Sequence, residues 1–268
     1  MTSIGVVFPP DQPPERLREV ALAADGSLDE LWLWEDCFAE SGVATAGAAL
    51  AWTRELRVGI GLLPVPLRNV ALTAMELATL ARLFPGRLLP GIGHGVLPWM
   101  AQVGARAASP LTLLREYARA LRALLAGETV TTDGEYVRLT DVRLAHPPTQ
   151  LPPLLIGATK PKTLALAGEL GDGVMFGGGA EGPDEVRDRV GTALDARPTG
   201  AGTLDIVATA MVPVDASVEQ VVEQARGFAA AGVTRLPVCG LDADGCPAAD
   251  ERILQLVETM ARARQRLG

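Results

Sequence analysis

The sequence predicts an α/β fold, a TIM (β/α)8 barrel, and three observations point to it. Short apolar or β-branched runs alternate with longer helical patterns eight times within 268 residues, which is the rhythm of this barrel. No linker-like or low-complexity stretch divides the chain, so we expect 1–268 to form one domain. The first strand is followed by Phe8-Pro9-Pro10, whereas a doubly wound sheet places a Gly-rich fingerprint there.

The first half of the chain contains four strand–helix units. Strands are expected over 4–8, 31–34, 57–61 and 87–92, and helices over 14–24, 43–53, 70–84 and 110–126. The fourth helix has the clearest limits, because Ser109 suits the N-cap, Pro110 the first turn and Gly127 the exit.

The second half repeats the pattern. Strands are expected over 154–157, 173–176, 205–209 and 236–239, and helices over 161–170, 183–194, 217–232 and 248–267. Ser217 and Gln220 have the spacing of a capping box at the start of the third of these helices. Pro237 weakens the last strand, because proline donates no hydrogen bond to a sheet.

An insertion follows the fourth helix. Residues 128–144 alternate apolar and polar side chains around Asp133-Gly134, which is the signal for a two-residue type I′ turn. We therefore expect a β-hairpin, followed by an extended Pro-rich tract that leads to the fifth strand.

Composition excludes several classes of function. The net charge of -8 opposes binding to nucleic acid or to an anionic membrane surface, and 4% aromatic residues are too few for base stacking. No apolar run is long enough to span a bilayer, and the first residues do not resemble a signal peptide. Three cysteines without metal-ligand spacing and two separate histidines predict no metal site and a reducing, cytoplasmic location. A small molecule is the expected partner.

The active site of such a barrel lies at the carboxyl ends of its strands. Glu35 and Asp36 directly follow the second strand, where they could orient a cofactor ring or move a proton, or else cap a helix or form a surface ion pair. His94 lies between two glycines after the fourth strand. It could be a catalytic group, because imidazole titrates near neutrality, or a loop histidine bonded to the nearby backbone.

Two Gly-rich turns follow the fifth and sixth strands. Gly157-Ala158-Thr159 and Gly177-Gly178-Gly179 each precede a helix, and amides at a helix N-terminus attract phosphate. Lys160 adds a positive charge beside the first of them. The alternative is that both are ordinary tight turns, and that Lys160 merely caps its helix.

The helix expected over 70–84 is apolar on nearly every face. An outer helix of a barrel should have one wet face. The excess of apolar side chains on this helix predicts a homodimer in which the helix is buried against a second copy of the chain. The alternative is that the chain's own loops cover its apolar surface.

Several segments together resemble the luciferase-like monooxygenase superfamily. They include LPVPLRN at 63–69, AMELATL at 74–80 and GIGHG at 91–95, whereas WMAQVGA at 99–105 and SPLTLLRE at 109–116 resemble the subgroup that depends on coenzyme F420. Lys160 stands where the family often has glycine, and Val70 replaces the usual proline after Arg-Asn.

The resemblance implies a dimeric TIM barrel that binds a flavin or deazaflavin at its carboxyl-terminal face. The ring would lie over a bulge at Gly61-Leu62-Leu63, where a non-prolyl cis peptide is expected, and the phosphate near the two Gly-rich turns. The implied catalytic residues are His94, Glu35 and Asp36. The implied cofactor-binding residues are Phe8, Gly61, Leu62, Leu63, Gly93, His94, Gly157, Ala158, Thr159, Lys160, Gly177, Gly178 and Gly179.

The leading functional hypothesis is hydride transfer between coenzyme F420 and a small organic substrate. The chain is compact, and a short lid would protect a peroxyflavin poorly, so an FMN-dependent monooxygenase is the second hypothesis. A non-catalytic flavin-binding protein is the third. An unrelated barrel hydrolase or aldolase would need a metal set or a lysine at a strand end, and Lys160 is its only candidate.

Overall fold

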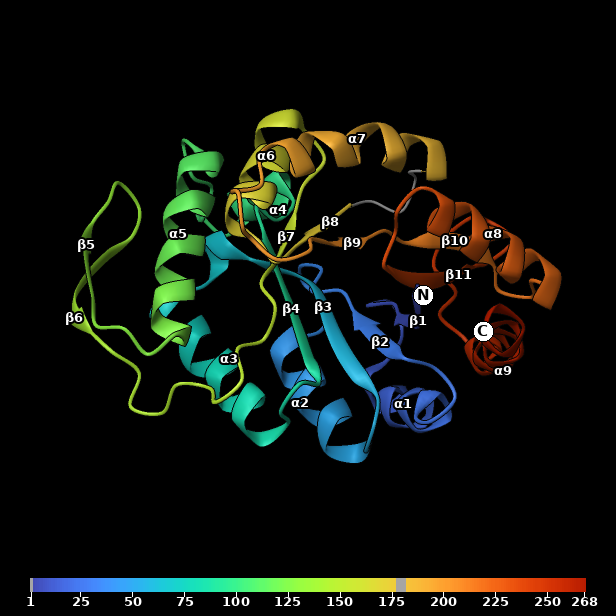
Figure 1. Ribbon diagram of the computed structural model, residues 1–268. Helices are drawn as coiled ribbons and strands as arrows, with labels where there is room; N and C mark the ends of the chain where they lie inside the picture. The colour runs from blue at the N-terminus through green and yellow to red at the C-terminus, as the bar shows by residue number, and fades with distance from the viewer. Residues whose placement is uncertain (1, 177–181) are drawn as a thin grey trace.

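Parallel strands close into a barrel with eight positions in the computed structural model, which describes residues 2–176 and 182–268 (Figure 1). β1 pairs with β11 and thereby closes the sheet. The predicted fold class is confirmed. The barrel strands are β1 (Ser3–Phe8), β2 (Glu30–Leu33), β3 (Arg57–Pro64), β4 (Leu88–Gly93), β7 (Leu155–Gly157), β8 (Gly173–Met175), β9 (Asp205–Val207), β10 (Ala210–Pro213) and β11 (Arg235–Leu241).

The seventh position of the barrel is filled by two strands. β9 and β10 both run parallel to β11, and they keep one register, with Val207 opposite Arg235 and Ala210 opposite Val238. The strand predicted over 205–209 therefore covers only the first piece. The predicted last strand is longer than expected and includes Pro237, which lies opposite Gly5 of β1.

Helices surround the barrel, as Figure 1 shows, and their limits agree with the predicted ranges to within a few residues. A short helix in the loop after β4 was not predicted. The helices are α1 (Leu17–Ala24), α2 (Gly42–Trp52), α3 (Val70–Leu83), the unpredicted α4 (Leu97–Gln102), α5 (Pro110–Leu125), α6 (Pro161–Leu170), α7 (Pro183–Asp195), α8 (Val218–Ala230) and α9 (Arg252–Leu267), with short 3-10 turns η1 (Pro14–Arg16) and η2 (Val65–Leu67).

Two helix starts test the predicted caps. The capping box of α8 is confirmed, because the Ser217 hydroxyl accepts the Gln220 N–H and the Gln220 side chain accepts the Ser217 N–H. Ser109 occupies the N-cap position of α5, but its hydroxyl bonds the Thr112 hydroxyl and caps no backbone amide.

The predicted hairpin is present and lies outside α5 (Figure 1). It consists of β5 (Val130–Asp133) and β6 (Arg138–Val142). The predicted two-residue turn is wrong, because Asp133 pairs with Arg138 and four residues separate them. The wider turn encloses the Glu116 carboxylate of α5, which accepts the N–H groups of residues 135–137 at 2.9–3.0 Å.

The apolar core has two parts. Side chains alternate along each strand, so one set faces the helices and the other fills the barrel interior. The outer part is the larger and includes most of the buried leucines. The interior cluster comprises Val7, Trp32, Leu89, Leu155, Met175, Val207 and Cys239, with Trp34 and Met211 packed against it.

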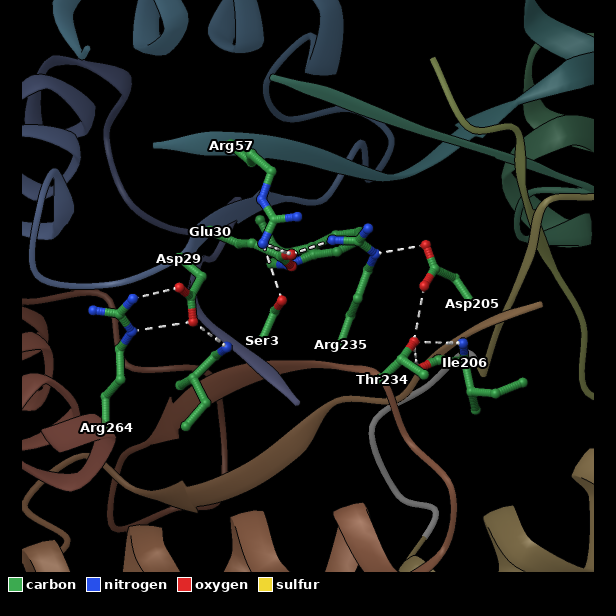
Figure 2. A network of polar contacts seen from close by, with 11 residues as sticks. Ser3, Asp29, Glu30, Arg57, Asp205, Ile206, Thr234, Arg235 and Arg264 are labelled. Atoms are coloured by element: carbon green, nitrogen blue, oxygen red, sulfur yellow. Dashed lines mark hydrogen bonds and ion pairs between the residues drawn. The ribbon is translucent and has the colours of Figure 1, made fainter. Parts of the chain in front are cut away.

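An ionic network lies at the opposite end of the barrel from the expected site, where the strands begin (Figure 2). Its centre is Glu30, a side chain with no exposed surface, which pairs with both Arg57 and Arg235. Arg235 also donates to Asp205 at 2.9 Å, and Arg57 donates to the Ser3 hydroxyl at 3.0 Å. The pairing matters because a buried carboxylate is tolerated only when charge and hydrogen bonds satisfy it.

Candidate active site

A bulge in β3 forms part of the floor at the carboxyl ends of the strands. The pairing register of β3 with β4 shifts between Ile60 and Leu63, and the Gly61–Leu62 peptide is cis. Both features lie at the segment that the family resemblance implies. The bulge falls within β3 rather than after it, because the strand continues to Pro64.

The Leu62 side chain brings three predicted site residues together. A Cβ atom added at Gly93 would lie 2.6 Å from Leu62 Cδ2, and one added at Gly157 would lie 2.3 Å from the same atom. Leu62 therefore covers the ends of β4 and β7, and only glycine fits beneath it. Gly61 in turn lies against Met175, whose Cε atom would be 2.6 Å from an added Cβ.

The turn after β7 presents exposed groups at the start of α6. Thr159 and Lys160 are exposed, and Lys160 occupies the N-cap position of this ten-residue helix. The Ala158 N–H is already used, since it donates to the Met175 carbonyl at 2.9 Å. The other predicted phosphate turn, Gly177–Gly179, lies outside the described residues.

Glu35 is held in an ion pair. Arg68 donates to its two carboxylate oxygens at 2.6 and 3.2 Å, and the Gly42 N–H at the start of α2 donates at 2.6 Å. Burial raises the pKa of Glu35, while Arg68 and Gly42 lower it. With these partners the carboxylate connects the loop after β2 to α2 and to the loop before α3. This arrangement corresponds to the ion pair that the sequence analysis gave as an alternative to a catalytic role.

Asp36 has a different environment. Its side chain is half-buried, and within 2–176 and 182–268 no group hydrogen-bonds its carboxylate. Burial raises the pKa of Asp36, and the negative charge of Asp11, in the loop after β1, raises it further. A carboxyl group with a raised pKa and no fixed partner is suited to exchange a proton.

His94 follows β4 as predicted, but its ring lies against the helices. Its Nε2 atom is 3.4 Å from the Thr163 hydroxyl on α6. Burial lowers the pKa of His94, and the carbonyl of Pro110, the first residue of α5, opposes this. The imidazole lies between the first turns of two outer helices, and its buried Nδ1 atom has no hydrogen-bond partner among the described residues.

Three of the predicted cofactor-binding side chains are buried between strands and helices. Phe8, Leu63 and Ala158 all belong to the outer part of the core, and Phe8 is only 1% exposed. Phe8 ends β1 on the outer face, because Val7 takes the inner face. For these three residues, only the backbone can contact a ligand at the strand ends.

The structure also adds groups that the sequence analysis did not select. Arg68 lies in the quoted LPVPLRN segment, but its partner Glu35 is 33 positions away. Glu40, in the loop after β2, has a buried Oε1 atom without a hydrogen-bond partner among the described residues. Burial, with the nearby Glu15, raises the pKa of Glu40 to about 7. Charge alone could not have marked these residues, since both types are common on loops.

Comparisons with known proteins identify the family. The family model described as luciferase-like monooxygenase matches residues 2–266. The chain belongs to this family. No helix among the described residues has the length and apolarity needed to cross a membrane.

Curated relatives of this luciferase-like chain include reductases and dehydrogenases. It is 31% identical over 244 residues to a 5,10-methylenetetrahydromethanopterin reductase of Archaeoglobus fulgidus, covering 90% of this chain and 73% of the relative. It is 29% identical over 238 residues to an F420-dependent glucose-6-phosphate dehydrogenase of Kineococcus radiotolerans, covering 82% and 70%. A reductase of Methanolobus tindarius is matched over 53% of its length, at 30% identity and 65% of this chain.

Solved structures share the fold. An F420-dependent secondary alcohol dehydrogenase in complex with an F420–acetone adduct superposes with a TM-score of 0.82 at 20% identity, covering 98% of this chain and all of that one. The F420-dependent tetrahydromethanopterin reductase of Methanopyrus kandleri has a TM-score of 0.79 at 17% identity, with 98% of both chains covered.

Proposed function

We propose that this luciferase-like chain is an oxidoreductase that transfers a hydride between coenzyme F420 and a small organic substrate. The observation that carries the proposal is the surface formed by the β3 bulge and Leu62 over Gly93 and Gly157, together with relatives named as F420-dependent. Gly93 and Gly157 let the Leu62 side chain lie against the ends of β4 and β7, so the bulge at Gly61 and Leu62 offers a surface on which a flat ring can lie.

The residues present fit such a cofactor. The ring would be held by the backbone at Gly61 and Leu62, and its phosphate by the exposed start of α6 with Lys160. The opposite part of the rim is acidic, since Asp11 and Asp36 interact unfavourably with each other, as do Glu15 and Glu40. We assign the α6 side to the anionic end of the cofactor and the β1–β2 side to the substrate.

The chain's own groups have separate roles in this proposal. When bound, F420 supplies a carbon centre that gives or takes a hydride. Asp36 accepts or returns the accompanying substrate proton at its carboxylate, for which its raised pKa is suited. Glu35 is a positioning residue, because its ion pair with Arg68 and its bond to Gly42 fix the loop that carries Asp36.

The acidic β1–β2 side favours neutral or cationic substrates over phosphorylated ones, because like charges repel in a site of low dielectric. The relative named above as an F420-dependent glucose-6-phosphate dehydrogenase acts on a phosphorylated sugar. We expect this chain to reduce or oxidise uncharged alcohols or carbonyl compounds faster than their phosphate esters, in an assay that follows F420 absorbance.

Titration of the protein with F420 and with FMN tests the cofactor assignment. We expect fluorescence quenching that saturates with F420 and weaker binding of FMN. Tight binding of FMN without binding of F420 would support the monooxygenase hypothesis and refute ours. The variant Asp36→Asn should bind F420 normally and lose turnover by about 100-fold or more, the range typical of a general acid or base. His94→Ala is the matched control and should retain most of its turnover.

We also propose a homodimer through α3. Three of its apolar side chains, Leu72, Met75 and Leu83, are between 47% and 65% exposed. They fall on one face at helical spacing. Met75→Glu should convert a dimer to a monomer in light scattering after gel filtration. Leu194→Glu, at a similarly exposed leucine of α7, should leave the oligomeric state unchanged.

A further inference from the structure

β2 and the residue that follows it carry a column of three side chains along the inside of the barrel. Glu30, Trp32 and Trp34 alternate with the outward-facing Leu31 and Leu33. Glu30 lies where the strands begin, and Trp34 packs on the interior cluster from the other side. Trp32 lies between them and is only 1% exposed. The column therefore joins the ionic network of Figure 2 to the end of the barrel where the candidate site lies.

The indole of Trp32 is fixed in one orientation. Its Nε1 atom donates to Glu30 Oε2 at 2.9 Å, while Glu30 Oε1 accepts from Arg235 and forms an ion pair with Arg57. The neighbouring strands leave space for the ring. A Cβ added at Gly5 would lie 2.9 Å from Trp32 Cδ1, and one added at Gly59 would lie 2.3 Å from Trp32 Cε3.

The same ring lies next to the β3 bulge. Gly61 follows Gly59 on the inner face of β3, and an added Cβ there would lie 3.6 Å from Trp32 Cε3 and 2.6 Å from Met175 Cε. The space on the inner side of Gly61 is thus filled by the Met175 side chain, with the indole next to it. A peptide at a bulge has fewer ladder hydrogen bonds than a regular strand, so its position depends on the side chains that it contacts.

We infer that Trp32 is a positioning residue for the cofactor seat, and that Glu30 sets its orientation from the far end of the barrel. This inference rests on the proposed function, since the seat is the Gly61–Leu62 bulge. Trp32 lies below the strand ends, in the interior cluster with Met175 and beside Gly61. It acts by holding the bulge in the shape to which the ring binds.

The variant Trp32→Phe tests the inference. It keeps an aromatic ring and leaves Glu30 paired with both arginines, but it removes the indole N–H and the second ring. The control is Arg57→Met, which weakens the same ionic network and leaves the Trp32–Glu30 hydrogen bond and Arg235 in place. Three quantities are measured: Tm, the Kd for F420, and hydrogen exchange of the peptide covering 57–64 in the cofactor-free protein.

If Trp32 positions the bulge, its replacement should weaken F420 binding by more than the loss of protein stability alone explains. We expect Trp32→Phe to raise the Kd for F420 about tenfold, equivalent to about 1.4 kcal/mol, and to accelerate exchange of the 57–64 peptide. Arg57→Met should lower Tm at least as much but leave the Kd unchanged. If the Kd follows Tm in both variants, Trp32 is merely structural and the inference is wrong.

Hydrogen exchange of the 57–64 peptide and titration of the wild-type protein with F420 distinguish this inference from the proposed function. Unchanged exchange in Trp32→Phe overturns the inference whichever cofactor binds, because the bulge then does not depend on the indole. A wild-type protein that fails to bind F420 refutes the proposed function. A wild type that binds F420, with a variant that binds it equally well, refutes the inference alone.

Discussion

Replacing Arg68 by methionine should destabilise the chain in a manner that depends on pH. Arg68 and Glu35 have side chains that are 15% and 8% exposed. Arg68→Met keeps the length of the side chain and leaves Glu35 with the Gly42 N–H as its only donor among the described residues. Loss of one partner of a buried ion pair costs about 3–5 kcal/mol, and we expect the lower end because Gly42 remains.

The size of the effect in an unfolding experiment follows from chain length. A loss of about 3 kcal/mol corresponds to a fall in Tm of roughly 6–12 °C, taking ~2–4 °C per kcal/mol for a chain of this size. Burial already raises the pKa of Glu35, and Arg68 is its main opposing charge. Without Arg68 the folded-state pKa rises further above the unfolded value.

The sign of the pH dependence follows from this difference. A carboxyl group with a higher pKa in the folded state binds more protons when folded, so stability falls as pH rises through that pKa. The defect of Arg68→Met should therefore be larger at pH 8 than at pH 5. Urea unfolding at both pH values measures it, with the double variant Glu35→Gln/Arg68→Met as control. An equal loss at both pH values, or a double variant as pH-sensitive as the single one, would refute the reasoning.

Further predictions concern packing, a helix cap and the hairpin. Gly59→Ala should lower stability by about 1–3 kcal/mol, because its Cβ would lie 2.3 Å from the buried indole of Trp32. Gly191→Ala, in the middle of α7 where no atom lies near the added Cβ, should raise stability by about 0.5–1 kcal/mol. Thermal unfolding that ranks the two variants in the other order would contradict this. Ser217→Ala should cost about 1 kcal/mol through loss of the α8 capping box, and no change in urea unfolding would contradict it. Burial opposes ionisation of Glu116, but the N–H groups of residues 135–137 outweigh it and lower its pKa; the hairpin contact is therefore present at neutral pH and lost as pH falls through the folded-state pKa. Glu116→Gln should accelerate hydrogen exchange of those amides at pH 7, and unchanged exchange would show that the carboxylate does not hold the turn.

The barrel could be predicted because it depends on a pattern that recurs along the chain. Eight alternations of short apolar runs with amphipathic segments require no knowledge of distant contacts. The split of the seventh position after Val207, and the short helix Leu97–Gln102, could not be predicted, because each depends on how a loop packs. The hairpin turn was misassigned because the carboxylate of Glu116 that shapes it comes from another element.

The candidate site was only partly predictable, for a related reason. Strands of a parallel barrel are buried on both faces, so their sequence does not show which side chains face inward. Phe8 was selected because it ends the first strand, and Leu63 because the family resemblance implies a bulge at 61–63, although both side chains face the helices. Glycines were more informative, because Gly93 and Gly157 both meet Leu62. The partners of Glu35 and His94, on which our proposed roles rest, became visible only once Arg68 and Thr163 were located.

The packing of Trp32 between glycines has a consequence for how such chains diverge. Positions 32 and 59 share one volume, since the indole occupies the space that a side chain at 59 would otherwise fill. A smaller residue at 32 would open a void, and a larger one at 59 would collide with the ring. Homologous sequences should therefore exchange bulk between these two positions, so that a loss of the indole accompanies a gain of alanine or valine at 59, whereas position 5 stays glycine because the Glu30 backbone also lies against it.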